Sequence, residues 1–120
     1  MNYKMWYSDD HEVLYVKTFA MITSEDVNQI MPQVTQIFKG KSRSLILADL
    51  SDNPSGLLSK EARGAFKKHA ESFKVDKIAI KGANPPIRMI AKIALTIIGS
   101  SDIARFFKEE EEALAWLKES

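Results

Sequence analysis

One stretch of the chain, residues 45–51, constrains the fold more than any other. It reads Leu-Ile-Leu-Ala-Asp-Leu-Ser, an apolar run that ends on polar residues, and the residues after it, 52–56, are dense in turn-forming types. A short apolar run between turn signals is typical of a strand covered on both faces, as in a parallel sheet. Ligands of open α/β sheets collect at the carboxyl ends of such strands. We therefore look for function first at the polar tip, residues 49–56, although this tip carries no catalytic signature.

Length and composition indicate one ordinary globular domain over residues 1–120. The chain has 120 residues, of which 45% are hydrophobic and 28% are charged. At this size one core suffices, and folding buries roughly two thirds of the surface that the unfolded chain exposes. The net charge is +1, and the basic residues are scattered among acids. Because there is no basic stripe, we expect no nucleic-acid partner.

The chain has no cysteine, which excludes disulfides, thiolate nucleophiles and thiolate metal ligands. Its two histidines, His11 in a predicted turn and His69 in a predicted helix, are too few for a histidine-based metal site. The first residues lack the layout of a signal peptide, and no window holds the roughly 20 apolar residues that cross a bilayer. The sequence therefore predicts a cytoplasmic protein with no transmembrane segment and no cofactor.

Hydrophobic periodicity predicts an α/β fold. In chain order, the expected elements are a β-hairpin (residues 3–7 and 13–19), a helix (27–38), a strand (44–50), a helix (59–74), a strand (77–80), a helix (87–98), a strand (103–107) and a helix (109–117). Thr23 and Asp26 approximate a capping box for the first helix, and Pro32 lies inside it. The order β-β-α-β-α-β-α-β-α predicts a mostly parallel five-stranded sheet with an N-terminal hairpin and right-handed crossovers.

The helix expected over residues 87–98 is unusually apolar. Its clearly polar members are Arg88, Lys92 and Thr96, and their four-residue spacing places them on one narrow stripe. One interpretation is a helix buried between the sheet and its neighbours. The other is an apolar face that covers something outside the core: a second subunit in a homodimer, an acyl chain or a membrane surface. The sequence leaves both interpretations open.

Four consecutive glutamates, residues 109–112, open the last predicted helix. Consecutive residues fan around a helix axis, so these carboxylates do not converge on a metal ion. They favour the positive end of the helix dipole and a solvated surface instead.

Several residues along the chain together resemble the SpoIIAA-like branch of the STAS superfamily, the sulfate transporter and anti-sigma-factor antagonist domain. They are Trp6 in the hairpin, Pro32 inside a helix, the strand that reads Leu-Ile-Leu-Ala-Asp, and a closing Arg105, Phe106 and Phe107 followed by acids, Ala113, Trp116 and Leu117. The resemblance spans nearly the whole chain. It implies a β-α superhelical fold, a fold relationship to CRAL-TRIO lipid carriers and a non-enzymatic role.

The resemblance also implies a candidate modification site. Anti-sigma antagonists of this fold carry a phosphorylatable serine in an Asp-Ser-Ser-Gly-Leu element after the central strand. Ser55, Gly56 and Leu57 match the end of that element, but Asn53 and Pro54 replace its first Asp-Ser. Ser55 is therefore either a phosphorylation site or one residue of a simple turn.

Two hypotheses of function follow. The first is a protein-interaction or regulatory module that uses loop 49–56, with Asp49, Ser51, Asp52 and Asn53 facing a partner and Ser55 as a switch. Phosphorylation there adds a charge of about −1.5 to −2 beside backbone donors at a helix N-terminus.

The alternative is a carrier or sensor of a small apolar or anionic, lipid-like ligand through helix 84–99. Lys81, Asn84 and Arg88 at its start would hold an anionic head group. We do not expect an enzyme, because the sequence contains no nucleophile elbow, phosphate loop or dinucleotide fingerprint. Asp49 could act as a general base only if burial raised its pKa.

Overall fold

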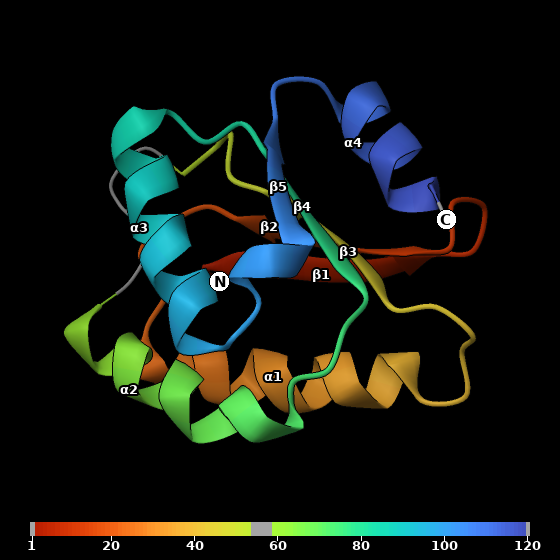
Figure 1. Cartoon of the computed structure of the whole chain (residues 1–120). Helices are drawn as coiled ribbons and strands as arrows, with labels where there is room; N and C mark the ends of the chain where they lie inside the picture. Colours follow the sequence, from red (N-terminus) through yellow and green to blue (C-terminus); the bar gives the residue numbers. More distant parts are fainter. Residues whose placement is uncertain (1, 54–58, 120) are drawn as a thin grey trace.

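The computed structural model describes residues 2–53 and 59–119, which form a five-stranded sheet flanked by helices (Figure 1). The strands are β1 (Tyr3–Ser8), β2 (Val13–Thr18), β3 (Leu45–Asp49), β4 (Lys77–Lys81) and β5 (Ala104–Phe107). They lie in chain order across the sheet. The hairpin pair β1 and β2 is antiparallel, and every later pair is parallel. The predicted α/β fold class with its N-terminal hairpin is thus confirmed.

Local capping signals define where the helices begin. The helices are α1 (Ser24–Phe38), α2 (Lys60–His69), α3 (Pro85–Ile97) and α4 (Glu110–Lys118), with short 3-10 segments η1 (Ala70–Ser72) and η2 (Ser101–Ile103). Thr23 and Asp26 form the predicted capping box at α1. Ser59 accepts a hydrogen bond from Ala62 N at α2, and Asn84 caps α3 in the same way. The starts of α1, α2 and α3 are therefore encoded within a few residues, whereas α4 has no side-chain cap and begins with acidic residues in its first turn.

The second helix is shorter than the sequence predicts. The apolar spacing indicates a helix to about Lys74, but α2 ends at His69 and the tighter turn η1 follows. Phe73 then has an extended backbone, with φ −86° and ψ 99°. The chain turns here toward β4, and the Phe73 side chain packs against the core between sheet and helices. A longer helix would carry that ring away from the core.

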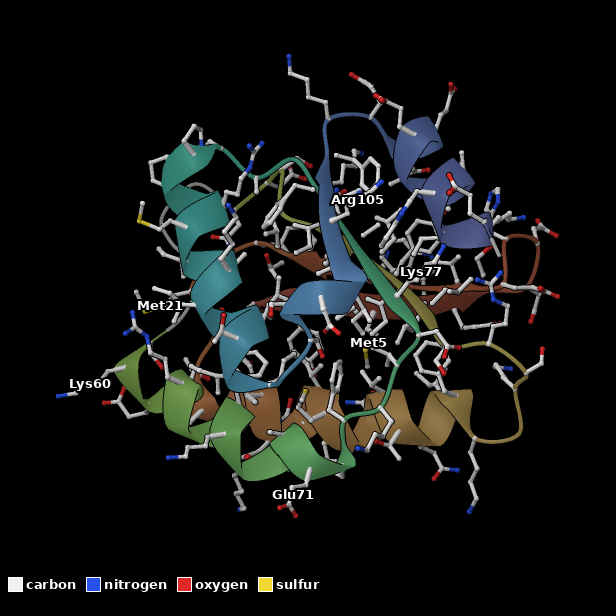
Figure 2. All side chains as sticks on the ribbon, viewed as in Figure 1. Met5, Met21, Lys60, Glu71, Lys77 and Arg105 are labelled. Carbon is white, nitrogen blue, oxygen red and sulfur yellow. The ribbon has the colours of Figure 1, made fainter. Side chains whose placement is uncertain are left out.

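The sheet separates two hydrophobic layers. Ile46 and Ile78 pack on the side of α1, α2 and α3, whereas Leu45, Leu47 and Ala79 pack on the side of α4. Figure 1 shows α1, α2 and α3 grouped apart from α4, which lies across the sheet. In Figure 2, Met5 of β1 lies in the larger layer and Lys60 points into solvent. Strand β3 is covered on both faces, as its apolar run predicts.

Helix α3 combines a buried face with an exposed apolar face. Ile87, Ala91 and Leu95 are buried against the core. On the outer side, Met89 is 68% exposed and Ile93 is 40% exposed. The helix therefore packs on its own chain through one face and leaves part of a second apolar face uncovered in a single copy.

Candidate functional site

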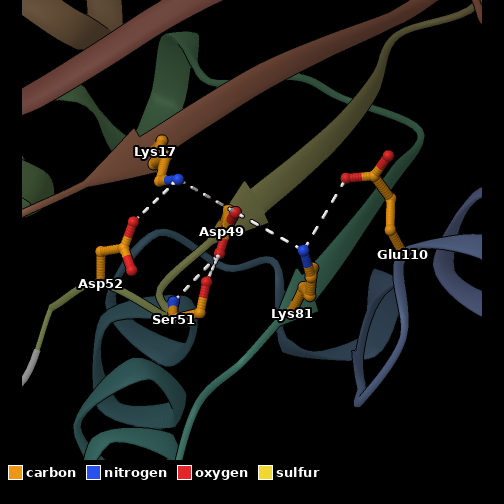
Figure 3. Close-up of polar contacts among 6 residues, drawn as sticks. All are labelled: Lys17, Asp49, Ser51, Asp52, Lys81 and Glu110. Atoms are coloured by element: carbon orange, nitrogen blue, oxygen red, sulfur yellow. Dashed lines mark hydrogen bonds and ion pairs between the residues drawn. The ribbon is translucent and has the colours of Figure 1, made fainter.

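Charged side chains meet where the parallel strands end (Figure 3). Lys17 Nζ lies 2.9 Å from an Asp52 oxygen and 3.9 Å from Asp49 Oδ2. Lys81 Nζ lies 3.7 Å from the same Asp49 oxygen and 3.8 Å from Glu110 Oε1. Asp49 on β3 thus lies between Lys17 on β2 and Lys81 on β4, the two strands that flank β3. We call this set the carboxyl-edge cluster: Lys17, Asp49, Ser51, Asp52, Lys81 and Glu110.

Asp49 is held as a carboxylate. Burial on its own would raise the pKa of Asp49, but the Ser51 hydroxyl and backbone N–H both donate to its Oδ1. These bonds, together with the ammonium groups of Lys81 and Lys17, outweigh burial and lower the pKa below its ordinary value. A general base at neutral pH needs the opposite shift. The cluster therefore has the properties of an ion-pair network, and Asp49 lacks those of a catalytic base.

A close backbone approach fixes the position of Ser51. Gly82 follows β4 with φ +78°, and a Cβ placed on it would lie 2.6 Å from the Ser51 Cβ and 2.8 Å from its Cα. No real side chain fits there, so only glycine permits this approach as well as this backbone conformation. Gly82 therefore holds the loop after β3 against the end of β4, where Asp49 and Lys81 pair.

The remaining predicted loop residues take different positions. Asn53 is 2% exposed, and its Nδ2 donates to Thr18 Oγ1 and to the Ala20 carbonyl. Its Oδ1 has no hydrogen-bond partner among residues 2–53 and 59–119. Asp52, by contrast, is 58% exposed in its side chain and presents a carboxylate to solvent. Ser55 lies outside the described residues, so its phosphorylation stays a prediction.

The three residues predicted to hold an anionic head group contact different partners. Lys81 pairs with Asp49 and Glu110. The Asn84 Oδ1 accepts from Ile87 N as the cap of α3. The Arg88 guanidinium lies 5.3 Å from the Phe106 ring centroid. Each side chain thus has its own partner, and the ligand-binding role of these residues stays a prediction.

A cavity of about 170 Å³ lies between the sheet and α1, α2 and α3. Among residues 2–53 and 59–119, every lining residue except Thr18 is apolar. The lining residues are Val16, Thr18, Ile22, Ile30, Met31, Val34, Ile46, Ala48, Leu50, Phe66, Phe73, Ile78, Ile80, Ala91, Ala94, Leu95 and Ile98. Hydrophobic periodicity predicts that most of these face the core. It could not predict that they leave space between them, because the space depends on how far α3 stands from the sheet.

The volume of the cavity is large for a domain of this size. Protein interiors pack like organic crystals, with few voids larger than a water molecule. The cavity is partly open to solvent. An enclosed void of about 170 Å³ would cost about 4 kcal/mol at the increment measured for core truncations, and that value is an upper bound for this one. That is a large share of a typical stability of about 5–15 kcal/mol. An apolar molecule in the cavity would recover most of the lost contacts.

Residues 2–53 and 59–119 contain neither a grouped set of metal ligands nor a membrane-spanning helix. Among these residues, no three histidine, aspartate or glutamate side chains are grouped so as to hold a metal ion. None of the described helices has the length and apolar character that crossing a bilayer requires. The carboxyl-edge cluster and the apolar cavity are therefore the two features on which we base a function.

The sequence pattern that defines the SpoIIAA-like family matches residues 13–118. The chain belongs to the SpoIIAA-like family. No curated protein sequence matches it. The family assignment confirms the resemblance seen in the sequence.

Structures that share the fold of this SpoIIAA-like chain agree with the assignment. An uncharacterised protein of Shewanella loihica with a SpoIIAA-like fold has a TM-score of 0.69 and 22% identity, over 96% of this chain and 91% of the other. The anti-sigma factor antagonist SpoIIAA in its unphosphorylated form has a TM-score of 0.63 and 11% identity, over 98% and 99%. A putative anti-sigma factor antagonist of Thermotoga maritima has a TM-score of 0.61 and 16% identity, over 98% and 95%. At these identities the likeness shows the fold alone.

Proposed function

We propose that this SpoIIAA-like protein is a non-catalytic regulatory module that binds a small apolar or amphiphilic molecule in the cavity beneath α3. The observation that carries the proposal is the cavity of about 170 Å³ with an almost wholly apolar lining. An apolar cavity of about 150 Å³ stays dry in water and takes up benzene or xenon. A cavity of similar size and lining therefore suits a hydrocarbon group of comparable size.

The carboxyl-edge cluster supports the non-catalytic part of the proposal. Its lysines and carboxylates pair with one another, and Asp49 is ionised at neutral pH. An ionised, paired carboxylate is a weak proton acceptor. A regulatory role agrees with the fold shared with the anti-sigma factor antagonist SpoIIAA. A cytoplasmic location and a homodimer stay predictions.

The ligand proposal is tested with n-hexane as the probe and Ala91→Leu as a cavity-filling variant. In hexane-saturated buffer, we expect the methyl NMR signals of Ile46, Ile78 and Leu95 to shift in the wild type and not in the variant. We also expect an organic extract of the purified wild type to contain an apolar molecule that the variant lacks. Unshifted signals in the wild type, or identical extracts, would refute the proposal.

A second candidate function is docking of a protein partner on the carboxyl-edge cluster. The specific observation is that Asp52 and Glu110 are 58% and 46% exposed in their side chains while their lysine partners are about half as exposed. The acids therefore dominate the outer surface of the cluster, which suits a partner with basic side chains.

This candidate is tested by reversing one charge. We expect Asp52→Lys to lose partners that the wild type retains on an affinity column, because it reverses the sign of the exposed group. Asp102→Lys is the matched control, since Asp102 is also an exposed acid but lies before β5, at the opposite edge of the sheet. Equal recovery of all partners by both variants would exclude docking at this cluster.

A further inference from the structure

The apolar cavity and the carboxyl-edge cluster are built from neighbouring residues of the same three strands. At the end of β3, Ala48 and Leu50 line the cavity, and Asp49 between them is the central carboxylate of the cluster. Because side chains alternate between the two faces along a strand, the cavity and the cluster lie back to back across the sheet. The flanking strands repeat this alternation with the lining residues Val16, Thr18 and Ile80 and the cluster residues Lys17 and Lys81.

The loop after β3 is anchored on two residues of the cavity wall. The Asn53 backbone N–H donates to the Leu50 carbonyl over 3.2 Å, and Asn53 Nδ2 donates to Thr18 Oγ1 over 3.0 Å. Leu50 and Thr18 both line the cavity. Beside these inner bonds, Asp52 reaches outward to Lys17 Nζ, 2.9 Å away (Figure 3). The exposed carboxylate therefore belongs to a loop whose inner side rests on the cavity wall.

From this arrangement we propose that the cavity regulates the carboxyl-edge cluster: an apolar molecule bound in the cavity fixes loop residues 50–53 and so holds the Asp52 carboxylate against Lys17. The proposal rests on the proposed function, because it states what binding in the cavity does to the surface of the protein. Occupancy of the cavity is then the input of the regulatory module, and the order of the exposed cluster is its output.

The direction of the effect follows from packing. Side chains that face an unfilled space lack contacts on that side, so an inward movement of Thr18 and Leu50 meets little resistance until a ligand occupies the space. Asn53 is 2% exposed, yet its Oδ1 has no hydrogen-bond partner among residues 2–53 and 59–119. A buried amide with one unpaired polar atom is held less firmly than a fully bonded one. The Leu50 N–H also donates to the Lys81 carbonyl over 2.9 Å, which connects the same wall to the second lysine of the cluster.

Amide hydrogen exchange measured by NMR, with n-hexane as the probe, tests the proposal. The Asn53 amide reports on the loop through its bond to the Leu50 carbonyl. The Lys41 amide is the matched control, because it donates to the carbonyl three residues earlier, that of Phe38, over 3.0 Å, and Phe38 lies outside the cavity lining. We expect saturating n-hexane to slow exchange at Asn53 about fivefold, the factor that one net hydrogen bond contributes, and to leave exchange at Lys41 unchanged.

Two variants test whether the effect passes through the cavity wall. Thr18→Val preserves the shape of the wall but removes the hydroxyl that Asn53 binds. In this variant n-hexane should still shift the methyl signals of Ile78 and Leu95, but it should no longer slow exchange at Asn53. Ala91→Leu fills part of the cavity with a side chain, so it should slow exchange at Asn53 without n-hexane. Should Thr18→Val fail to fold, Ala91→Leu tests the same link.

The outcomes separate this inference from the proposed function. If n-hexane fails to shift the methyl signals of the wild type, the proposed function is wrong and this inference falls with it. If n-hexane shifts those signals but exchange at Asn53 keeps its rate, the cavity is a ligand site and the regulatory link is wrong. Equal slowing at Asn53 and Lys41 would also overturn the link, because it indicates general stabilisation. The same holds for a full n-hexane effect in folded Thr18→Val, or for unchanged exchange at Asn53 in Ala91→Leu.

Discussion

Replacing Ala91 by leucine is expected to stabilise the ligand-free protein, whereas the same replacement at Ala62 is expected to destabilise it. Both alanines lie on helices and both are buried, at 7% and 0% exposure. They differ in their surroundings, because Ala91 lines the cavity and Ala62 does not. In an ordinary core, enlarging a buried alanine costs about 1–3 kcal/mol through overpacking. We expect that cost at Ala62 alone.

The magnitude at Ala91 follows from the volume available. Leucine adds three carbon atoms to alanine. At about 0.8 kcal/mol for each buried methyl or methylene group, their burial stabilises the folded state by about 2.4 kcal/mol. Ordering the leucine side chain costs about 0.5–1 kcal/mol, which leaves a net stabilisation of about 1.5 kcal/mol. The cavity of about 170 Å³ accommodates the added atoms without displacing its walls.

Urea denaturation followed by circular dichroism measures both variants. With a slope of about 1.5 kcal/mol per M, Ala91→Leu should raise the midpoint by about 1 M, and Ala62→Leu should lower it. The protein is first stripped of bound molecules by unfolding and refolding, because a ligand would mask the gain. A lower midpoint for both variants would mean that the space beneath α3 closes in solution, and the ligand hypothesis would then lose its basis.

Three further predictions test other parts of the structure. Gly82→Ala should lower stability by several kcal/mol more than Gly40→Ala, because both glycines have positive φ but a Cβ at Gly40 meets nothing within 4 Å; equal losses in urea denaturation would contradict the close approach to Ser51. Asp49→Asn should lower stability at pH 7 by about 1 kcal/mol. The pKa of Asp49 is lowered in the folded state, so its contribution to stability is present above the unfolded pKa of about 3.9 and is lost as pH falls through the folded pKa. The difference in unfolding free energy between wild type and Asp49→Asn should therefore vanish in acid. Ile93→Asp should leave a monomer unchanged but should dissociate a homodimer formed through the exposed face of α3, which light scattering at micromolar concentration distinguishes.

The sequence carries enough information to predict the elements and their order, because those depend on local signals. Thr23 with Asp26, Ser59 and Asn84 are caps that act within a few residues. The alternation of Leu45, Ile46 and Leu47 between the two layers follows from the strand period alone. The end of α2 was not predictable in this way, because Phe73 leaves the helix to reach a core that forms only in three dimensions.

The candidate site was predictable only in part. The meeting of Asp49, Ser51 and Asp52 at the end of the central strand follows from strand polarity and chain order. The inward turn of Asn53 does not, since its partners are Thr18 and Ala20 on a strand and loop far away in the sequence.

Small side chains in the lining leave the space that forms the cavity. Three of its lining residues are alanines: Ala48 on β3 and Ala91 and Ala94 on α3. A helix that served only to stabilise the core would gain from larger apolar side chains at such positions, as the Ala91→Leu calculation illustrates. Helix α3 instead carries large apolar residues, Met89 and Ile93, on its exposed side. The inner face of α3 also carries large residues, Ile87 and Leu95, so the space lies where Ala91 and Ala94 stand between them, and it is expected to persist unless a ligand fills it.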